Sequence, residues 1–201
     1  MRYGPEHKAN TRAKILAAAG RLFRRRGFHA AGVDAVMSEA GLTPGGFYTH
    51  FGSKEALLAD ALEHAAEGMA ARLSADLEGL PESGPARAEA FVAFYLNPAH
   101  REAVEDGCPL AALISEVPRA GEPVRKTFEA ALLRLAARIS DDGPDRDRAF
   151  AVVSLCVGAL GLARSVQDEA LADRILEAAR SLAADALAVQ RPGSGSGSAS
   201  R

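Results

Sequence analysis

Apolar side chains recur every three or four residues along most of this chain, which is the period of one face of an α-helix. Between residues 11 and 26 this spacing is followed by Ile15, Leu16, Ala19, Leu22 and Phe23. Residues that favour strands are few: aromatic residues make up 5% of the 201, and there is no Trp. Because the abundant Ala, Leu, Arg and Glu favour helix over sheet, the sequence predicts an all-α fold.

Glycine, proline and capping residues divide this pattern into separate helices. We expect helices over residues 11–26, 33–40, 44–51, 53–80, 86–97, 110–120, 123–140, 146–166 and 170–189. Thr43 is a suitable N-cap before Pro44, and Ser53 is a suitable cap for the long helix that follows it. The most apolar stretch, residues 149–163, is shorter than the roughly 20 residues of a membrane span. We therefore expect a buried helix there and no membrane partner.

The net charge of −2 is unevenly distributed. Residues 1–60 carry nine Lys and Arg against five Asp and Glu, a net +4, and the remainder carries 15 against 21, a net −6. A basic segment on an acidic body suits a protein that meets a polyanion such as DNA at one end. Cys108 and Cys156 show no metal-ligand or disulfide spacing, and the N-terminal residues lack the apolar run of a signal peptide. A cytoplasmic protein is expected.

The segment "GLTPGGFYTHFGSKEALL" (residues 41–58) places two adjacent glycines and a proline between helices. Residues 33–51 fit a helix-turn-helix, two short helices joined by a tight turn, whose second helix enters the DNA major groove. Without Cβ atoms, Gly45 and Gly46 would let the backbone approach the groove wall and the neighbouring helix.

The side chains that follow these glycines divide into two faces. Phe47 and Phe51, four residues apart, are expected to point into the core. Outward positions are then left for Tyr48, Thr49 and His50, with Lys54 at the start of the next helix, and all four can donate to phosphates. The alternative is an ordinary surface loop with half-buried Tyr48 and His50.

The run from "TRAKILAAAGRLFRRRGF" through "GLTPGGFYTHFGSKEALL" closely resembles the N-terminal domain of TetR/AcrR-family transcriptional regulators, over about residues 9–60. The resemblance implies that double-stranded operator DNA is a partner, with Pro44 and Gly45 nearest the base edges. It also implies phosphate contacts from Thr43, Tyr48, His50 and Lys54, and an N-terminal arm with Lys8 and Arg12. Many members have Thr in place of Ala31 as the cap of the second helix, so here Asp34 and the backbone of Gly32 would have to replace that cap.

The domain organisation follows from this resemblance. It implies an N-terminal three-helix helix-turn-helix DNA-binding domain (1–54), joined by a long helix to a larger helical ligand-binding and dimerisation domain (55–190), with a flexible tail (191–201). Residues 150–166 are apolar around nearly the whole helix, which together with 170–189 indicates a four-helix homodimer interface. The candidate interface residues are Val153, Val157, Gly158, Gly161 and Leu176.

An effector pocket is implied by the family, and each of its candidate residues also fits an ordinary core. The candidates are Phe91, Phe94, Tyr95, Cys108, Leu110, Leu113, Glu116, Phe128, Leu132, Cys156 and Leu160. Glu116 is the most suggestive of them, because a buried carboxylate needs a partner.

The predicted function is therefore that of a sequence-specific transcriptional regulator, a repressor released from its operator by a small, largely apolar effector of unknown identity. The alternatives are gating by thiol oxidation at Cys108, whose place near a helix start would lower its pKa, or no effector. No nucleophile–base pair or phosphate loop is present in the sequence, so no enzyme activity and no cofactor are expected. Asp60, His64 and Glu67 share a helix face and could ligate a metal, although solvated side chains are the favoured interpretation and no metal is expected.

Overall fold

The computed structural model describes residues 5–81, 84–140 and 143–188, and within these ranges all regular structure is helical. The elements are α1 (Pro5–Arg26), α2 (Val33–Glu39), the 3-10 helix η1 (Pro44–Thr49), α3 (Lys54–Asp76), α4 (Pro85–Tyr95), α5 (Pro98–Glu102), α6 (Pro109–Leu113), the 3-10 helix η2 (Val117–Arg119), α7 (Glu122–Ala137), α8 (Gly143–Ser165) and α9 (Glu169–Ala188). The all-α prediction is confirmed. The predicted flexible tail, 191–201, lies outside the described residues.

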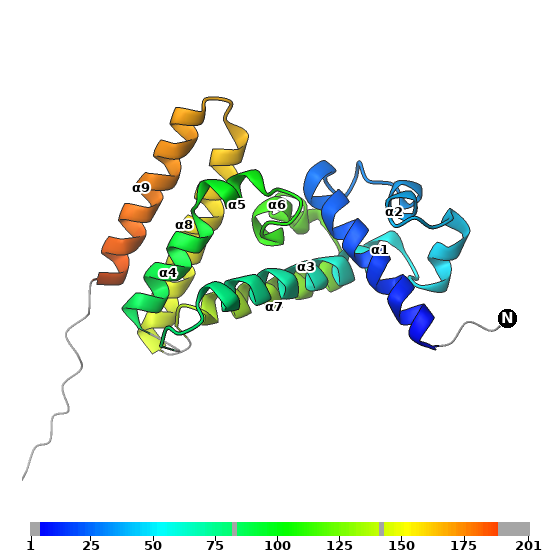
Figure 1. Cartoon of the computed structure of the whole chain (residues 1–201), viewed down its shortest axis with the longest axis horizontal. Coiled ribbons are helices and arrows are strands. Elements are labelled where there is room, and N and C mark those ends of the chain that lie inside the picture. The colour runs from blue at the N-terminus through cyan, green and yellow to red at the C-terminus, as the bar shows by residue number, and fades with distance from the viewer. Residues whose placement is uncertain (1–4, 82–83, 141–142, 189–201) are drawn as a thin grey trace, which may run out of the picture.

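The molecule is elongated, with α1, α2 and η1 at one end and the α8–α9 pair at the other (Figure 1). We call α1, α2 and η1 the head, and α4–α9 with η2 the body. The long helix α3 belongs to both: Ala61 and Ala65 lie against Gly20 of α1, and α3 also packs along α7. The predicted division between residues 54 and 55 falls in the first turn of α3, and the apolar core continues across it.

Helix ends follow local chemistry. Gly27, directly after α1, and Gly41, two residues after α2, have φ values of 80° and 70°, a left-handed conformation that glycine adopts without steric cost. The Ser53 side chain accepts a hydrogen bond from the Ala56 N–H at 3.0 Å and caps α3, as predicted. Thr43 occupies the N-cap position of η1, but its side chain makes no capping bond.

Some predicted boundaries were wrong. α1 begins at Pro5 rather than at residue 11, so Lys8 and Arg12 lie on a helix and not in an extended arm. The single helix expected over 110–120 is split into α6 and η2, because Pro118 has no N–H and disfavours helical backbone before it. The short helix α5 was missed, although the Asn97 side chain caps it and Pro98 fits its first position.

The apolar stretch of α8 is longer than the sequence pattern indicated. Arg146–Ser165, 20 residues, is long and apolar enough to cross a membrane by length and composition, a test that core helices also pass. Of this stretch 44% is buried inside the molecule. α8 packs against α9, α7 and α6, which is the environment of a core helix.

His100, in the short helix α5, is buried in the body. Its ring Nδ1 lies 2.7 Å from the Tyr95 carbonyl oxygen, and its Nε2 accepts a hydrogen bond from the Cys108 N–H at 3.0 Å. Nδ1 therefore carries the proton of a neutral ring. Burial lowers the pKa of His100 to about 4, and the positive charge of Arg164 contributes to this shift.

We expect Ser53→Ala to lower the free energy of unfolding by about 1 kcal/mol, because it removes the bond that caps α3. Thr43→Ala is the matched control: its side chain makes no capping bond, so stability should change by less than about 0.5 kcal/mol. Urea unfolding followed by circular dichroism measures both. Equal losses in the two variants would contradict the capping role of Ser53.

The buried His100 should make the protein less stable in acid. Between pH 6.5 and about 4 the unfolded chain binds a proton at His100 and the folded chain does not, so stability should fall as the pH drops. The expected loss from pH 7 to pH 5 is about 2 kcal/mol, measured by urea unfolding. His100→Gln should remove most of this loss, whereas His64→Gln, at an exposed position of α3, should retain it. An unchanged loss in His100→Gln would disprove the assignment.

Candidate nucleic-acid interface and effector cavity

The helix-turn-helix presents one buried and one exposed face. Phe47 and Phe51 are buried, as predicted, and their rings stack with centroids 5.8 Å apart. The opposite face of η1 and its N-cap is open to solvent, and Tyr48 is 77% exposed. The exposed residues of this face are Thr43, Pro44, Gly45, Tyr48 and Thr49. The turn therefore offers hydroxyl groups and a glycine backbone to a partner.

Gly45 and Gly46 are not required by the fold itself. Neither has a positive φ. A Cβ built on Gly45 would meet no atom within 4 Å, and one on Gly46 would lie 3.6 Å from Met37 Cε, an ordinary van der Waals distance. The protein alone would accept side chains at both positions.

His50 and Lys54 are only partly exposed. Burial lowers the pKa of His50, with a smaller contribution from the positive charges of Lys8 and Arg12. Its Nδ1 is buried and has no hydrogen-bond partner in the described part of the chain. Lys54 Nζ lies 4.4 Å from the centre of the Phe28 ring and 3.5 Å from the His29 carbonyl oxygen, and burial lowers its pKa.

The two cations predicted in an N-terminal arm are in different environments. Lys8 is exposed on α1. Arg12 lies 2.5 Å from the Asp60 carboxylate and 4.8 Å from the centre of the Phe51 ring. Its charge is therefore engaged in holding α1 to α3. This ion pair also involves Asp60, which is one of the three residues considered as metal ligands.

The start of α2 lacks the side-chain cap that the family pattern led us to seek. Gly32 occupies the N-cap position, and no side chain makes a capping bond there. Asp34 lies in the first turn of α2, where its negative charge interacts favourably with the positive end of the helix dipole. Ala31 is fully buried.

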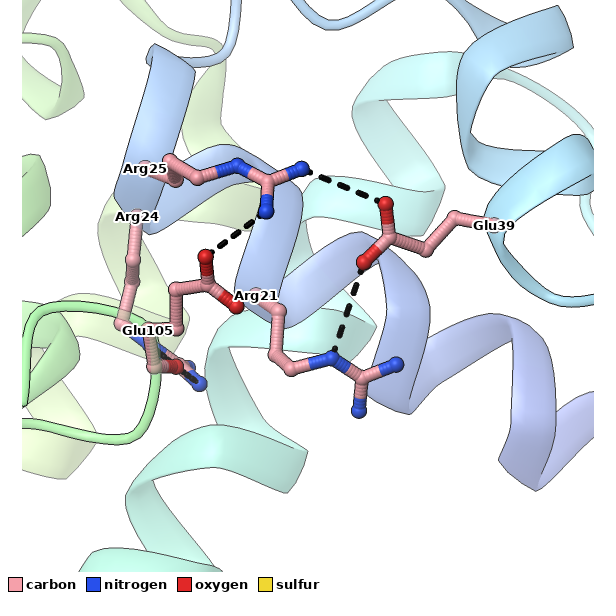
Figure 2. A network of polar contacts seen from close by, with 5 residues as sticks. All are labelled: Arg21, Arg24, Arg25, Glu39 and Glu105. Carbon is pink, nitrogen blue, oxygen red and sulfur yellow. Dashed lines mark hydrogen bonds and ion pairs between the residues drawn. The ribbon is translucent and has the colours of Figure 1, made fainter.

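An ionic network joins the head to the body (Figure 2). Arg25 of α1 lies 2.7 Å from the Glu105 carboxylate in the body and 3.3 Å from the Glu39 carboxylate at the end of α2. Arg21 lies 3.7 Å from the other oxygen of Glu39. The Arg24 side chain donates to the backbone carbonyl of Glu105. Sequence periodicity gave no indication of this network, because its members lie far apart in the chain.

Two further carboxylates join separate parts of the molecule by accepting hydrogen bonds from backbone N–H groups. One joins the body to the head, and the other joins α3 to the body. Glu116 accepts a hydrogen bond from the Phe28 N–H at 2.6 Å, in the connection between α1 and α2. Glu55 accepts one from the Gly121 N–H, just before α7. Glu116, predicted in the effector pocket, is thus a connection between body and head.

A cavity of about 510 Å³ lies between α3, α4, α6 and α7. Its walls are mainly apolar and small, with three arginines, and consist of Ala66, Met69, Ala70, Leu73, Arg87, Cys108, Pro109, Leu110, Ala131, Arg134, Leu135, Ala137 and Arg138. Cys108 and Leu110 are shared with the predicted lining. The other candidates pack elsewhere: Phe91, Tyr95, Leu113, Cys156 and Leu160 are buried in the core, and Phe94, Phe128 and Leu132 pack partly buried against it.

Arg87 was missed by sequence reasoning, although a signal was present. It stands four residues before Phe91 and eight before Tyr95, on the buried stripe of α4. A charged residue on an apolar stripe requires a partner or a cavity.

The predicted dimer residues fall into two groups. Val153, Val157 and Leu176 are buried within the protomer itself. Gly158 is exposed and Gly161 partly so, and a Cβ on either would meet no atom within 4 Å. Three leucines of α8 and α9 are also exposed, namely Leu162, Leu171 and Leu182. In the described ranges no group of three His, Cys, Asp or Glu side chains is arranged to hold a metal ion.

The chain is similar in sequence and in fold to known bacterial regulatory proteins. The family model described as "Bacterial regulatory proteins, tetR family" matches residues 15–61, which span the second half of α1, the helix-turn-helix and the start of α3. The chain is 39% identical over 70 residues to the HTH-type transcriptional regulator UidR of Escherichia coli strain K12; the match covers 35% of this chain and about a third, 36%, of UidR.

Two further comparisons cover most of the chain. An uncharacterized HTH-type transcriptional regulator of Mycobacterium tuberculosis strain H37Rv is 30% identical over 174 residues, covering 78% of this chain and 86% of that protein. The crystal structure of a TetR-family transcriptional regulator from Cytophaga hutchinsonii superposes with a TM-score of 0.72 at 20% identity, covering 94% of this chain and 100% of that one. The chain belongs to the tetR family of bacterial regulatory proteins.

Proposed function

We propose that this protein is a sequence-specific DNA-binding transcriptional regulator, a repressor that a small molecule releases from its operator in the cytoplasm. The observation that carries the proposal is the exposed face of the helix-turn-helix. Thr43, Tyr48 and Thr49 place hydroxyl groups there, and nothing in the described protein uses them. Hydroxyl groups of this kind commonly donate to phosphates.

Gly45 supports close approach to the base edges. The fold leaves open space where its Cβ would be and gives it no positive φ. A glycine that the protein does not need is explained if an external surface comes close to its backbone. Pro44 and Gly45 lack side-chain hydrogen-bond groups, so we expect recognition through thymine methyl contacts and DNA shape rather than through bidentate bonds.

His50, Lys54 and Lys8 are proposed as further phosphate contacts. The lowered pKa of His50 leaves its ring mostly neutral at pH 7, so it would meet a phosphate through an N–H group. Lys54 is held beside Phe28 and His29, which fixes its charge next to the N-terminus of α3. Arg12 is better explained as a positioning residue, since Asp60 already binds its guanidinium.

Tyr48→Phe and Lys54→Ala should weaken binding to all DNA sequences about equally, because phosphate contacts carry no sequence information. Lys54→Ala should also reduce the slope of log affinity against log salt by roughly one unit. Lys126→Ala, an exposed lysine of α7, is the control and should change neither. Fluorescence anisotropy with a selected operator and a scrambled duplex over a salt series measures these effects.

In the same assay Gly45→Arg should change which operators are preferred rather than overall affinity alone. The free protein has room for the new side chain, so an altered preference would report on DNA. If Tyr48→Phe and Lys54→Ala leave both affinities unchanged, this surface is not the DNA-contacting one and the proposal fails.

A homodimer through α8 and α9 would place two heads on one DNA duplex. The buried positions of Val153, Val157 and Leu176 assign them to the protomer core. The proposed contact surface is therefore the exposed stripe that contains Gly158, Gly161 and Leu162 on α8 and continues on α9. Exposed leucines beside glycines allow close packing of helices from a second copy.

Gly158→Arg should produce monomers that lose operator affinity, because the new charge would stand in the helix contact. The protomer itself should fold, since a Cβ at Gly158 meets no atom within 4 Å. Leu133→Glu, at an exposed leucine of α7, is the control and should leave the dimer intact. Light scattering at micromolar concentration measures the mass. A monomeric wild-type protein would overturn the arrangement.

The cavity is the proposed effector site, and two structural elements connect it to the head. α3 lines the cavity with Ala66, Met69 and Leu73, and begins beside the helix-turn-helix. α6 lines it with Pro109 and Leu110, and is preceded by the segment that contains Glu105. A ligand that displaces α6 would move Glu105 against Arg25 and, through Arg25, would move α2 (Figure 2).

Thiol oxidation at Cys108 remains the alternative gating mechanism. Cys108 lines the cavity, so an oxidant that entered the cavity would reach it. The rest of its environment gives less support, because the residue is only 1% exposed. A reactive thiol is usually open to solvent, whereas a buried one is usually inert.

A further inference from the structure

Three arginines bring positive charge to a cavity whose other walls are mainly apolar. Arg87, Arg134 and Arg138 line it, and the described residues of its lining include no Asp or Glu. An arginine remains charged throughout the physiological pH range. The pocket that periodicity predicted was apolar, whereas the observed one combines alanine, leucine and methionine walls with guanidinium groups.

The three arginines differ in how far the protein satisfies them. Arg134 lies 2.7 Å from the Glu63 carboxylate, so its charge is already paired. Arg138 donates to the Ser74 hydroxyl at 3.1 Å. Arg87 is only 7% exposed, and within the described residues its guanidinium bonds the Pro81 carbonyl oxygen alone, at 3.2 Å. A buried charge without a carboxylate is costly unless an anion reaches it.

Arg87 and Arg138 lie at the same end of the cavity. The bond from Arg138 to Ser74 places the end of α7 beside the end of α3, and the bond from Arg87 to Pro81 places the start of α4 beside the connection that follows α3. These helix ends meet away from the head (Figure 1). Pro109 and Leu110 of α6 form a wall without charge, so the cavity is polar at one end and apolar along α6.

We propose that the effector is an apolar carboxylate, bound with its anionic group on Arg87 and Arg138 and its hydrocarbon body against α6. The guanidinium of Arg87 can bind a carboxylate through two parallel N–H bonds. The hydrocarbon body would bury apolar surface against Met69, Leu73 and Leu110, and the cavity volume of about 510 Å³ is in the range of small-molecule sites. This inference rests on the proposed effector function of the same cavity.

The test uses the full-length protein and matched pairs of probes: decanoate with decanol, and 2-naphthoate with 2-naphthylmethanol. Isothermal titration calorimetry should show at least one carboxylate binding ten times or more tighter than its alcohol, and decylamine should not bind. Arg87→Met, which keeps an apolar stem, should weaken that carboxylate about 10- to 100-fold and leave its alcohol unchanged. Arg125→Met, at an exposed position of α7 outside the cavity, should leave both affinities unchanged.

Each outcome decides one of the two claims. Equal affinity for acid and alcohol, binding of the amine, or no binding of either carboxylate overturns the charge assignment, whatever the behaviour of the variants. A carboxylate that binds with the expected preference but leaves operator affinity unchanged supports the chemistry and overturns the proposed regulation. Should Arg87→Met not fold, Arg138→Met and the wild-type comparison of acid with alcohol still decide whether the site selects a carboxylate.

Discussion

The irregular segment between α5 and α6 is the point on which the arrangement of head and body depends. Carbonyl groups at and beyond the end of a helix have no partner within that helix, so they need other donors. Arginines from three helices supply them: Arg24 of α1 donates to the Glu105 carbonyl oxygen and Arg72 of α3 to that of Asp106. Arg164 of α8 donates to the carbonyl oxygens of His100 and Arg101, at the end of α5. At Gly107 the backbone is so close that a Cβ would lie 2.6 Å from both the Ala103 carbonyl oxygen and Arg164 Nη2. One short segment thus fixes helices of head and body against each other.

Holding the segment in this way has an electrostatic cost. Burial lowers the pKa of Arg24 to about 10 and also lowers that of Arg164. Both guanidinium groups are therefore partly desolvated, yet they stay charged at neutral pH. Their hydrogen bonds offset this cost only while the carbonyl groups keep their positions. The segment leads directly into Pro109 and Leu110, which line the cavity. The proposed ligand, bound against that wall, would press on this set of hydrogen bonds. Breaking them would leave partly buried charges without partners, which favours a shift between two discrete arrangements over a graded one.

The sequence predicted what depends on neighbours within a few residues. The end of α1 at Gly27, the Ser53 cap and the inward faces of Phe47 and Phe51 all follow from spacings of one to four residues. Contacts across long separations were beyond such reasoning. Arg12 was assigned to an arm because Asp60, 48 residues away, could not be known as its partner. Glu116 was assigned to the pocket because the Phe28 N–H, 88 residues away, could not be known as its donor.

The cavity lining was missed for a different reason. Periodicity shows that a side chain is buried, and the largest buried side chains, such as Phe91, fill space rather than line it. The observed walls are formed where small residues from different helices face one another, as Ala66 of α3 and Ala131 of α7 do. The sequence nevertheless carried a local signal at each candidate site: Gly45 in a helical turn without a positive φ, and Arg87 on an apolar stripe with no carboxylate partner among the described residues. A residue that departs from local helix chemistry further than its own fold requires points to a partner outside the protein.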